Sequence, residues 1–388
     1  MPRYIKNIKY NSKSSHGFSK TLLTRYKQYF KDNNLEKEAT VGMWLRMTAM
    51  FLTYLANWAL LAFYEFSLPT TILLIVSFAC LTMIVTFTVS HEAVHGTISK
   101  KKWVNDLIYW VTFNLAGPNA YLWKIRHNNA HHFFVNIPGS DIDIESTNLI
   151  RISPHSEWKP YHRFQHIYIL ALYSIFTLHW ILFKDFKLYF VKSFGNVTDF
   201  KHKHWRFIEL VLLKAFYLSF MIGIPYFNHT YALSTIIYAF IAYHLFMSCV
   251  LLIIFASSHV GTGSHFVSHD EDHKIPHSFF EHQILTSVDF HPSHPVFCFF
   301  FGGFNSHVAH HMFPQTSSVH YGPLSKIIKQ TALEFNQPYQ ERSFFQLWKE
   351  HFELLIEMGK NPHAGNKFFI KPEKTENSKE EVEGKLVC

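Results

Sequence analysis

The stretch PTTILLIVSFACLTMIVTFTVSHEAVH, residues 69–95, joins a long apolar segment directly to a pair of histidines. Residues 69–90 carry no charged side chain, and they approach the length of roughly 20 residues that a membrane-spanning helix needs. His91 and His95 follow at once and lie four residues apart, so they share one face of a helix. The stretch predicts a transmembrane helix that ends in a metal-binding pair.

Two more histidine clusters follow, HNNAHH at 127–132 and HVAHH at 307–311. A single HxxxH is weak evidence, because a chain with 28 histidines contains roughly two at random. The triple patterns HxxHH and HxxxHH are rarer, with roughly 0.3 expected by chance, and both occur here. Residues four apart, such as His127 and His131, are expected to bind one metal together. A neighbour such as His132 points about 100° away, so adjacent pairs can serve two ions.

The clusters offer eight imidazoles, which is more than the three or four ligands of a zinc site. Imidazole suits Zn, Cu, Fe and Ni, and two irons would use the whole set. The four cysteines are scattered without CxxC spacing, which excludes a thiolate site. The chain is 48% hydrophobic and only 16% charged, which is typical of membrane spans that alternate with polar segments. The cations behind the net charge of +8 are therefore expected to set membrane topology and to contact lipid headgroups rather than to bind nucleic acid.

The expected fold is all-α and integral to the membrane, with four transmembrane helices as two hairpins, in-plane helices and a cytoplasmic helical cap. The predicted spans are Met47–Phe66, Pro69–Ser90, Phe207–Tyr226 and Tyr231–Ala256. An even number of spans must separate the second cluster from the third if they share one site, so Phe164–Phe183 is expected to lie in the membrane plane. Lys and Arg are frequent beside the clusters and absent from the short turns, which places all three clusters in the cytoplasm.

Three regions are expected along the chain. Residues 1–43 form a cytoplasmic N-terminal segment, in which the amphipathic stretch Phe18–Phe30 is expected on the membrane surface. Residues 44–345 form the membrane domain. Residues 346–388 form a C-terminal helix and a charged tail, which is expected to be disordered from Lys371 on.

The motifs resemble those of the membrane fatty acid desaturase superfamily, in particular its acyl-CoA or linoleoyl-CoA branch. The resemblance covers roughly residues 5–340 and rests on HEAVH, on HNNAHH with the following NIPGSDID, and on GGFNSHVAHHMFP with SVHY. It implies a non-haem di-iron centre, in the bacterial inner membrane or the endoplasmic reticulum. The implied ligands are the eight histidines of the clusters and a polar residue at the end of the last span: His91, His95, His127, His131, His132, His259, His307, His310 and His311.

The resemblance further implies an enzyme that uses O2 and two electrons to introduce a cis double bond into a long acyl chain, bound as acyl-CoA or acyl-lipid. Hydrogen removal from an unactivated methylene needs an oxidant that side chains cannot supply and iron with oxygen can. Two features depart from the pattern. His307 stands where front-end desaturases often have Gln, and the His-Pro-Gly-Gly signature of a fused cytochrome b5 is absent. The electron donor is therefore expected to be a separate protein of the cytochrome b5 or ferredoxin type.

Several other residues have both a functional and a purely structural interpretation. Five of them are candidates to orient ligand imidazoles, or else ordinary loop residues: Trp123, Asn128, Asp141, Asp143 and Asp289. Residues 107–123 and 297–304 are candidates for the acyl tunnel, or else lipid-facing packing. The ladder of His265, His269, His273 and His277 is expected in a solvated loop rather than a second metal site, because glycines and a proline interrupt any helix there.

Two other functions remain open from the residues alone. A hydroxylase or ketolase of lipids, alkanes or carotenoids would use the same iron chemistry. A membrane metal transporter would need ionisable residues inside the spans to form a pathway. Of the ligand-type histidines only His244 lies deep in a predicted span, which disfavours transport.

Overall fold

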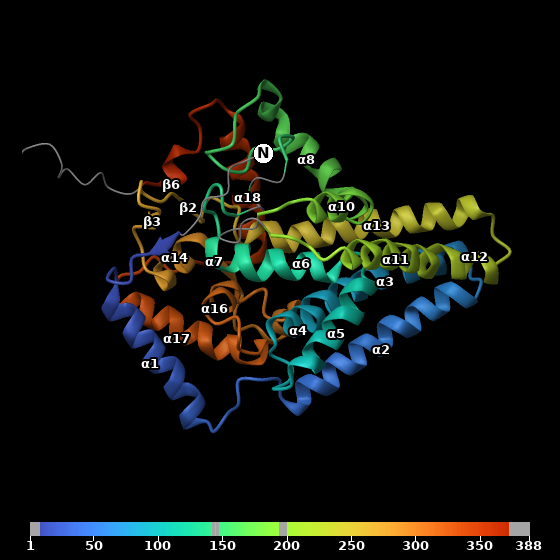
Figure 1. Ribbon diagram of the computed structural model, residues 1–388, viewed down its shortest axis with the longest axis horizontal. Coiled ribbons are helices and arrows are strands. Elements are labelled where there is room, and N and C mark those ends of the chain that lie inside the picture. Colours follow the sequence, from blue (N-terminus) through green and yellow to red (C-terminus); the bar gives the residue numbers. More distant parts are fainter. Residues whose placement is uncertain (1–7, 142–143, 145–146, 194–199, 372–388) are drawn as a thin grey trace, which may run out of the picture.

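The computed structural model describes residues 8–371 apart from 142–143, 145–146 and 194–199, and the described chain is mostly helical. Figure 1 shows a long narrow bundle of helices, the arm, and a broader region at one end of it, the cap. The arm contains α2 (Val41–Phe63), α3 (Leu68–Val85), α11 (Trp205–Leu218), α12 (Ile224–Asn228) and α13 (Leu233–Ser257).

The cap and its junction with the arm contain the remaining helices. Three helices lie at the junction: α8 (Gln165–Ser174), α9 (Phe176–His179) and α10 (Asp185–Tyr189). The others are α1 (His16–Asp32), α4 (His91–His95), α5 (Lys102–Leu115), α6 (Ala120–Arg126), α7 (His132–Phe134), α14 (Phe279–Thr286), α15 (Pro295–Phe301), α16 (His307–Met312), α17 (Tyr321–Glu334) and α18 (Phe344–Gly359). The predicted domain boundaries at 43/44 and 345/346 fall within the first residues of α2 and α18.

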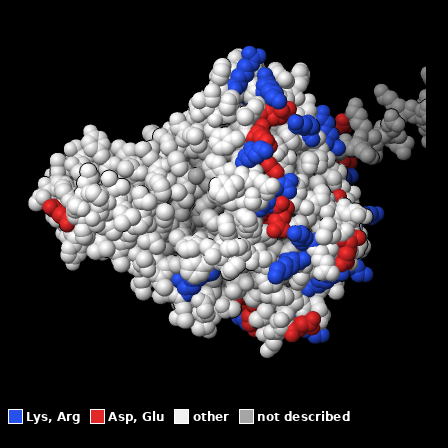
Figure 2. Space-filling model, turned by 180° about the vertical axis from the view of Figure 1, so that it is seen from behind, with Lys and Arg blue, Asp and Glu red and all other residues white. Residues whose placement is uncertain are grey.

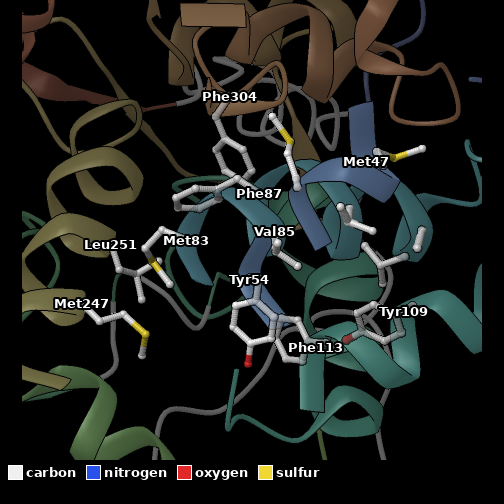
Figure 3. Close-up of a cluster of buried hydrophobic side chains, with 14 of the residues drawn as sticks. Met47, Tyr54, Met83, Val85, Phe87, Tyr109, Phe113, Met247, Leu251 and Phe304 are labelled. Carbon is white, nitrogen blue, oxygen red and sulfur yellow. The ribbon is translucent and has the colours of Figure 1, made fainter. Parts of the chain in front are cut away.

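The arm is held together by apolar and aromatic packing. The helices α2 and α3 are joined by the short link 64–67 and run beside each other (Figure 1). The ring of Trp58 stacks on that of Phe220, with centroids 4.1 Å apart, which ties α2 to the segment before α12. Figure 3 shows the apolar cluster at the base of the arm, where Met83 and Leu251 approach each other beneath Phe87. The first histidine cluster packs against these apolar side chains.

Three of the described helices are long and apolar enough to cross a membrane, namely Leu68–His95, Trp205–Asn228 and Leu233–Leu252. The segment around Phe164–Phe183 forms two helices bent by 61°, and the count is four if this pair is one span. The predicted span Met47–Phe66 is not among the helices that pass this test. Although α2 packs along α3, polar residues such as Arg46 and Asn57 dilute its apolar character.

Charged residues inside the arm have local partners. Lys214 lies in α11, and its Nζ is 2.5 Å from Oδ2 of the fully buried Asp185 in α10. The same carboxylate accepts the backbone N–H of Asn119 at 2.7 Å. Glu209 pairs with Arg206 one turn earlier at 2.6 Å. Because a buried charge is tolerated only when it is paired, these contacts explain how α11 carries Lys and Glu and still passes as a span.

The N-terminal helix does not offer a free apolar face. Phe18, Leu22, Tyr26 and Phe30 of α1 are buried, and they pack with α17 and with the apolar side of α16. The expectation that Phe18–Phe30 lies on the membrane surface is therefore wrong, because the protein itself covers the apolar side of this helix. Hydrophobic periodicity identified an amphipathic helix but could not tell a protein surface from a lipid surface.

Short parallel strand pairs fasten distant segments of the cap. Lys9–Tyr10 (β1) pairs with Lys274–Ile275 (β3) and brings the N-terminal segment onto the loop before α14. The other two pairs are β2 (Phe266–Val267) with β6 (Phe369–Ile370), and β4 (Asp289–Phe290) with β5 (Glu341–Arg342). Figure 2 shows that, on the face viewed, Lys, Arg, Asp and Glu gather on the cap and leave the arm almost bare.

Candidate metal centre

The first two of the three histidine clusters lie beside or within a wide, π-helical turn. A π-helical turn, Thr86–Ser90, connects α3 to α4, which consists of the first cluster. A second π-helical turn is formed by His127–His131 itself and leads into α7. Single π-turns inside α-helices are rare and are frequent at functional sites. The third cluster forms α16, which is an ordinary helix.

All nine predicted ligands meet in the cap beneath α3 and α13. Their nitrogen atoms form two groups, within each of which the ligand atoms lie within 4.8 Å of one another. The five-histidine group consists of His91, His95, His127, His132 and His310. The three-histidine group consists of His131, His259 and His311. His307 adjoins the latter, since its Nε2 is 2.6 Å from Nε2 of His259.

The structure corrects one detail of the predicted pairing. His127 and His131 were expected to share a metal, but they belong to different groups, and His127 pairs with His132 instead, at 2.9 Å between their Nε2 atoms. In an α-helix His132 would lie about 140° around the axis from His127. The π-turn has i→i+5 hydrogen bonds, which bring residues five apart nearly into line. Sequence spacing alone did not reveal the wide turn.

Burial favours the neutral form of imidazoles in both groups. Burial lowers the pKa of His259 to about 3, and burial together with the neighbouring imidazoles lowers the pKa of His310 and of His311 well below its ordinary value. A neutral imidazole has a free nitrogen lone pair, which is the form that binds a metal. His95 is the half-buried member, whereas the other eight are buried.

The donor set fits bound metal ions. Nε2 of His91 is buried and has no hydrogen-bond partner among the described residues. An unpartnered buried nitrogen is costly, and a metal ion would satisfy it. Neither group contains a carboxylate or a thiolate. Imidazole-only sets of this kind suit iron, copper or zinc, and two separate groups provide for two ions.

Four of the five residues predicted to orient the ligands are in contact with the site. Trp123 stacks on His127 with ring centroids 4.1 Å apart. Asp141 lies 3.7 Å from Nδ1 of His131. Asn128 donates to the carbonyl of Val94 inside the first cluster, at 3.3 Å. These contacts link the first and second clusters to their surroundings.

Asp289 supports the third cluster. One oxygen of its buried carboxylate accepts the backbone N–H of Val308 at 2.7 Å, at the start of α16, and the other accepts the Tyr339 hydroxyl at 2.6 Å. Burial raises the pKa of Asp289 to about 7. The contact caps the helix that carries His307. The remaining candidate, Asp143, lies outside the described residues.

Three contacts were missed by sequence reasoning. Glu92, inside the first cluster, accepts the backbone N–H of Ser318 at 2.7 Å, and Tyr321 places its hydroxyl 3.3 Å from Nδ1 of His310. Phe304 lies against His91 with ring centroids 4.4 Å apart. The sequence offered a signal only for Glu92, which is a carboxylate between two ligands. The helical period directs its side chain about 100° from that of His91.

The histidine ladder does not form a metal site in the described chain. His269 and His273 contact each other, with ring centroids 5.1 Å apart, but neither joins a group of three candidate ligands. Nδ1 of His277 lies 3.4 Å from Glu281 at the start of α14. The ladder begins just before β2 and ends just before α14, and its four histidines lie outside helices, as expected, in loop segments on either side of β2 and β3.

Two hollows lie near the site. A cavity of about 290 Å³ is lined by His95 and by Lys100, Lys102 and Lys124, together with Asp106 and Glu38. An apolar groove of about 260 Å³ lies between α2 and α5, with Val89 in its lining. Within the predicted tunnel segments, Leu107, Ile108, Val111 and Thr112 line this groove, whereas Phe297 packs on Phe290 and His291.

Comparison with known proteins agrees with this site. The family model described as "Fatty acid desaturase" matches residues 66–343. A "sn-1 linoleoyl-lipid 6-desaturase" of Arthrospira platensis is 30% identical over 354 residues, which cover 90% of this chain and 95% of that protein. A protein of the same name from Synechocystis sp. is 29% identical, covering 91% and 98%. An "Acyl-lipid (8-3)-desaturase" of Physcomitrium patens is 26% identical, covering 91% and 74%. The chain therefore belongs to the fatty acid desaturase family and is an oxidoreductase of that class.

Proposed function

We propose that this desaturase introduces a cis double bond into a long acyl chain of a membrane lipid, using O2, two electrons and two irons bound by the nine histidines. The observation that carries the proposal is the division of nine closely placed imidazoles, eight of them buried, into two groups in one place. The names of the relatives favour an acyl-lipid over an acyl-CoA substrate. The family to which the chain belongs favours iron over copper or zinc.

The residues of the chain would divide the work as follows. The five-histidine group would hold one iron, and the three-histidine group with His307 the other. Bound iron would supply the activation of O2 that removes hydrogen from a methylene group. Phe304 on His91 and Trp123 on His127 cover the ligands with apolar rings, which helps to exclude water from the reacting carbon.

The proposed membrane arrangement places the arm in the bilayer and the cap in the cytoplasm. The hairpins α2–α3 and α11–α13 would then supply the crossing segments, with α2 included because it packs along α3 and not by its own hydropathy, and α8–α10 would bend within the membrane face. The turns at the far end of the arm are joined by Glu65, which accepts hydrogen bonds from the backbone and hydroxyl of Thr230 at 2.7 Å. Lys and Arg concentrate on the cap, as the positive-inside rule requires (Figure 2).

The two electrons are proposed to come from a separate carrier of the cytochrome b5 or ferredoxin type. The lysine-lined cavity beside His95 supports an approach from this side, because His95 is the half-buried ligand and cations there attract an acidic partner.

The decisive experiment is expression of the full chain in a host that lacks the product, followed by fatty acid and lipid analysis. We expect a new unsaturated acyl chain on membrane lipids. His310→Ala should abolish it, and the control His269→Ala in the loop should retain it. Mass spectrometry that finds an added oxygen instead of two lost hydrogens would favour the hydroxylase. Product formed by His310→Ala would refute the assignment of the site.

A further inference from the structure

The first and third clusters are linked on the side facing away from the ligand nitrogens. Glu92 lies between His91 and His95, yet it is buried and turned toward the segment after the third cluster. Its Oε1 accepts the backbone N–H of Ser318 at 2.7 Å, and its Oε2 accepts the Thr97 hydroxyl at 2.5 Å. Both carboxylate oxygens therefore have partners, although the group is removed from water.

Ser318 begins a short 3-10 helix, Ser318–His320, that runs directly into α17. The first N–H groups of a helix have no partner within it, and a carboxylate there satisfies one of them with a charge-assisted hydrogen bond. Glu92 thus fixes the start of this helical segment. The next residue after the 3-10 helix is Tyr321, which is itself buried.

The hydroxyl of Tyr321 lies 3.3 Å from Nδ1 of His310, a member of the five-histidine group. If His310 binds a metal through Nε2, its Nδ1 must keep a proton, and this N–H then donates to the Tyr321 oxygen. The contact fixes the tautomer and the ring orientation of His310. A partner on the other imidazole nitrogen typically changes metal affinity or activity by about 10- to 100-fold.

Two glycines keep this connection short. A Cβ on Gly303, whose φ is +86°, would lie 2.5 Å from the ring of Tyr321 and 2.7 Å from Ser318. A Cβ on Gly302, whose φ is +54°, would lie 2.6 Å from the carbonyl oxygen of Phe87. The Gly-Gly pair therefore fills the space between the turn before the first cluster and Tyr321, where no larger residue fits.

We propose that Glu92 and Tyr321 are positioning residues for the metal centre: Glu92 holds the start of the segment Ser318–Tyr321, and Tyr321 in turn orients His310. The inference rests on the proposed function, because it assumes a metal at the five-histidine group. It adds a role for the acidic residue of the first cluster and for the Tyr that ends the third motif.

The test uses the purified full chain in detergent or nanodiscs, loaded with Fe2+ without oxygen and, in parallel, with Co2+ as a spectroscopic probe. Tyr321→Phe removes only the hydroxyl. Its matched control is Tyr217→Phe, since the buried Tyr217 hydroxyl also bonds a histidine, His244 at 3.0 Å, inside the arm. We expect Tyr321→Phe to lower metal affinity at one of the two sites about tenfold and to change the Co2+ spectrum, with Tyr217→Phe unchanged.

Glu92 is tested by a pair of variants and a double-mutant cycle. Glu92→Ala should reproduce the spectral change of Tyr321→Phe, whereas Glu92→Gln, which keeps an oxygen to accept the Ser318 N–H, should restore most of the affinity. If the two residues act through one path, the metal affinity of the double variant should be no lower than that of the weaker single variant.

Three outcomes decide the matter. Unchanged metal affinity in Tyr321→Phe would overturn the inference even if Glu92→Ala fails to fold. Additive losses of affinity in a folded double variant would overturn it as well. A wild-type chain that binds no iron or makes no unsaturated product would instead overturn the proposed function. Wild-type desaturation with an inert Tyr321→Phe would refute the positioning role alone.

Discussion

The five-histidine and three-histidine groups share α16 and the second cluster, but they differ in exposure and in support. The five-histidine group contains the half-buried His95 and borders the lysine-lined cavity. The three-histidine group is fully buried, and its His259 bonds the carbonyl of Thr286 at 3.0 Å through Nδ1. One group is reachable from this cavity and the other is enclosed. The comparison shows that one fold can give two similar sets of histidine ligands different access to solvent.

The largest expected effect separates the two groups by ligand removal. His132→Ala, in the five-histidine group, and His311→Ala, in the three-histidine group, should each abolish desaturation, because the reaction needs both metals. Each variant should keep the metal of the other group. Metal analysis of the purified variants checks this, with His269→Ala as the control. Loss of both metals in each variant would show that the groups form one inseparable site.

The next effect concerns access. A soluble chelator should remove metal from the five-histidine group first, because His95 opens to the cavity and the other group does not. Metal release followed over time should therefore show a fast and a slow phase. His132→Ala, which lacks the accessible site, should show the slow phase alone. A single phase in the wild-type protein would contradict unequal access.

A smaller effect is expected from the support of the enclosed group. Asp141→Asn removes the charge 3.7 Å from Nδ1 of His131, while one side-chain oxygen still accepts the backbone N–H of Asn136. We expect metal affinity at the three-histidine group to fall about 10- to 100-fold and that of the other group to stay. Titration with Fe2+ measures both sites. Equal weakening of the two sites would indicate a general loss of folding instead.

The smallest effect is expected at the rim of the cavity. Lys100 pairs with Glu36 at 2.9 Å on the surface, so Lys100→Gln should leave the free energy of unfolding nearly unchanged. If an acidic donor docks there, turnover at low ionic strength should fall several-fold. The difference from wild type should vanish in high salt, since surface charges are screened. A loss that persists in high salt would argue against electrostatic docking.

The residues that the sequence made predictable are those whose chemistry is visible in spacing. The eight clustered histidines could be identified from the patterns, whereas His259 required the resemblance, because it stands alone after the last span. The π-turn at 127–131 could not be predicted, since its wide geometry depends on the partners of His127 and His132. Glu92 was hidden for a similar reason: its partner Ser318 is distant in the sequence.

Three of the four predicted spans pass the test of length and hydropathy and α2 does not, while in the cap the apolar face of α1 is covered by protein. Arg46 and Asn57 lie in a helix that packs along α3, so tertiary packing stabilises what composition alone would not. The apolar side of α1 meets α17 rather than lipid, and its periodicity is the same in either case. Which surface covers an apolar face is decided by the rest of the chain.

The wide turn at 127–131 has a consequence for how the enzyme matures. The i→i+5 geometry of this turn aligns His127 with His132. We therefore expect a metal ion held by these two imidazoles to stabilise the π-helical turn. A chain without iron would then be free to tighten this turn into an ordinary α-helix, which would swing His132 out of alignment with His127. Metal binding and the formation of this turn would then be coupled.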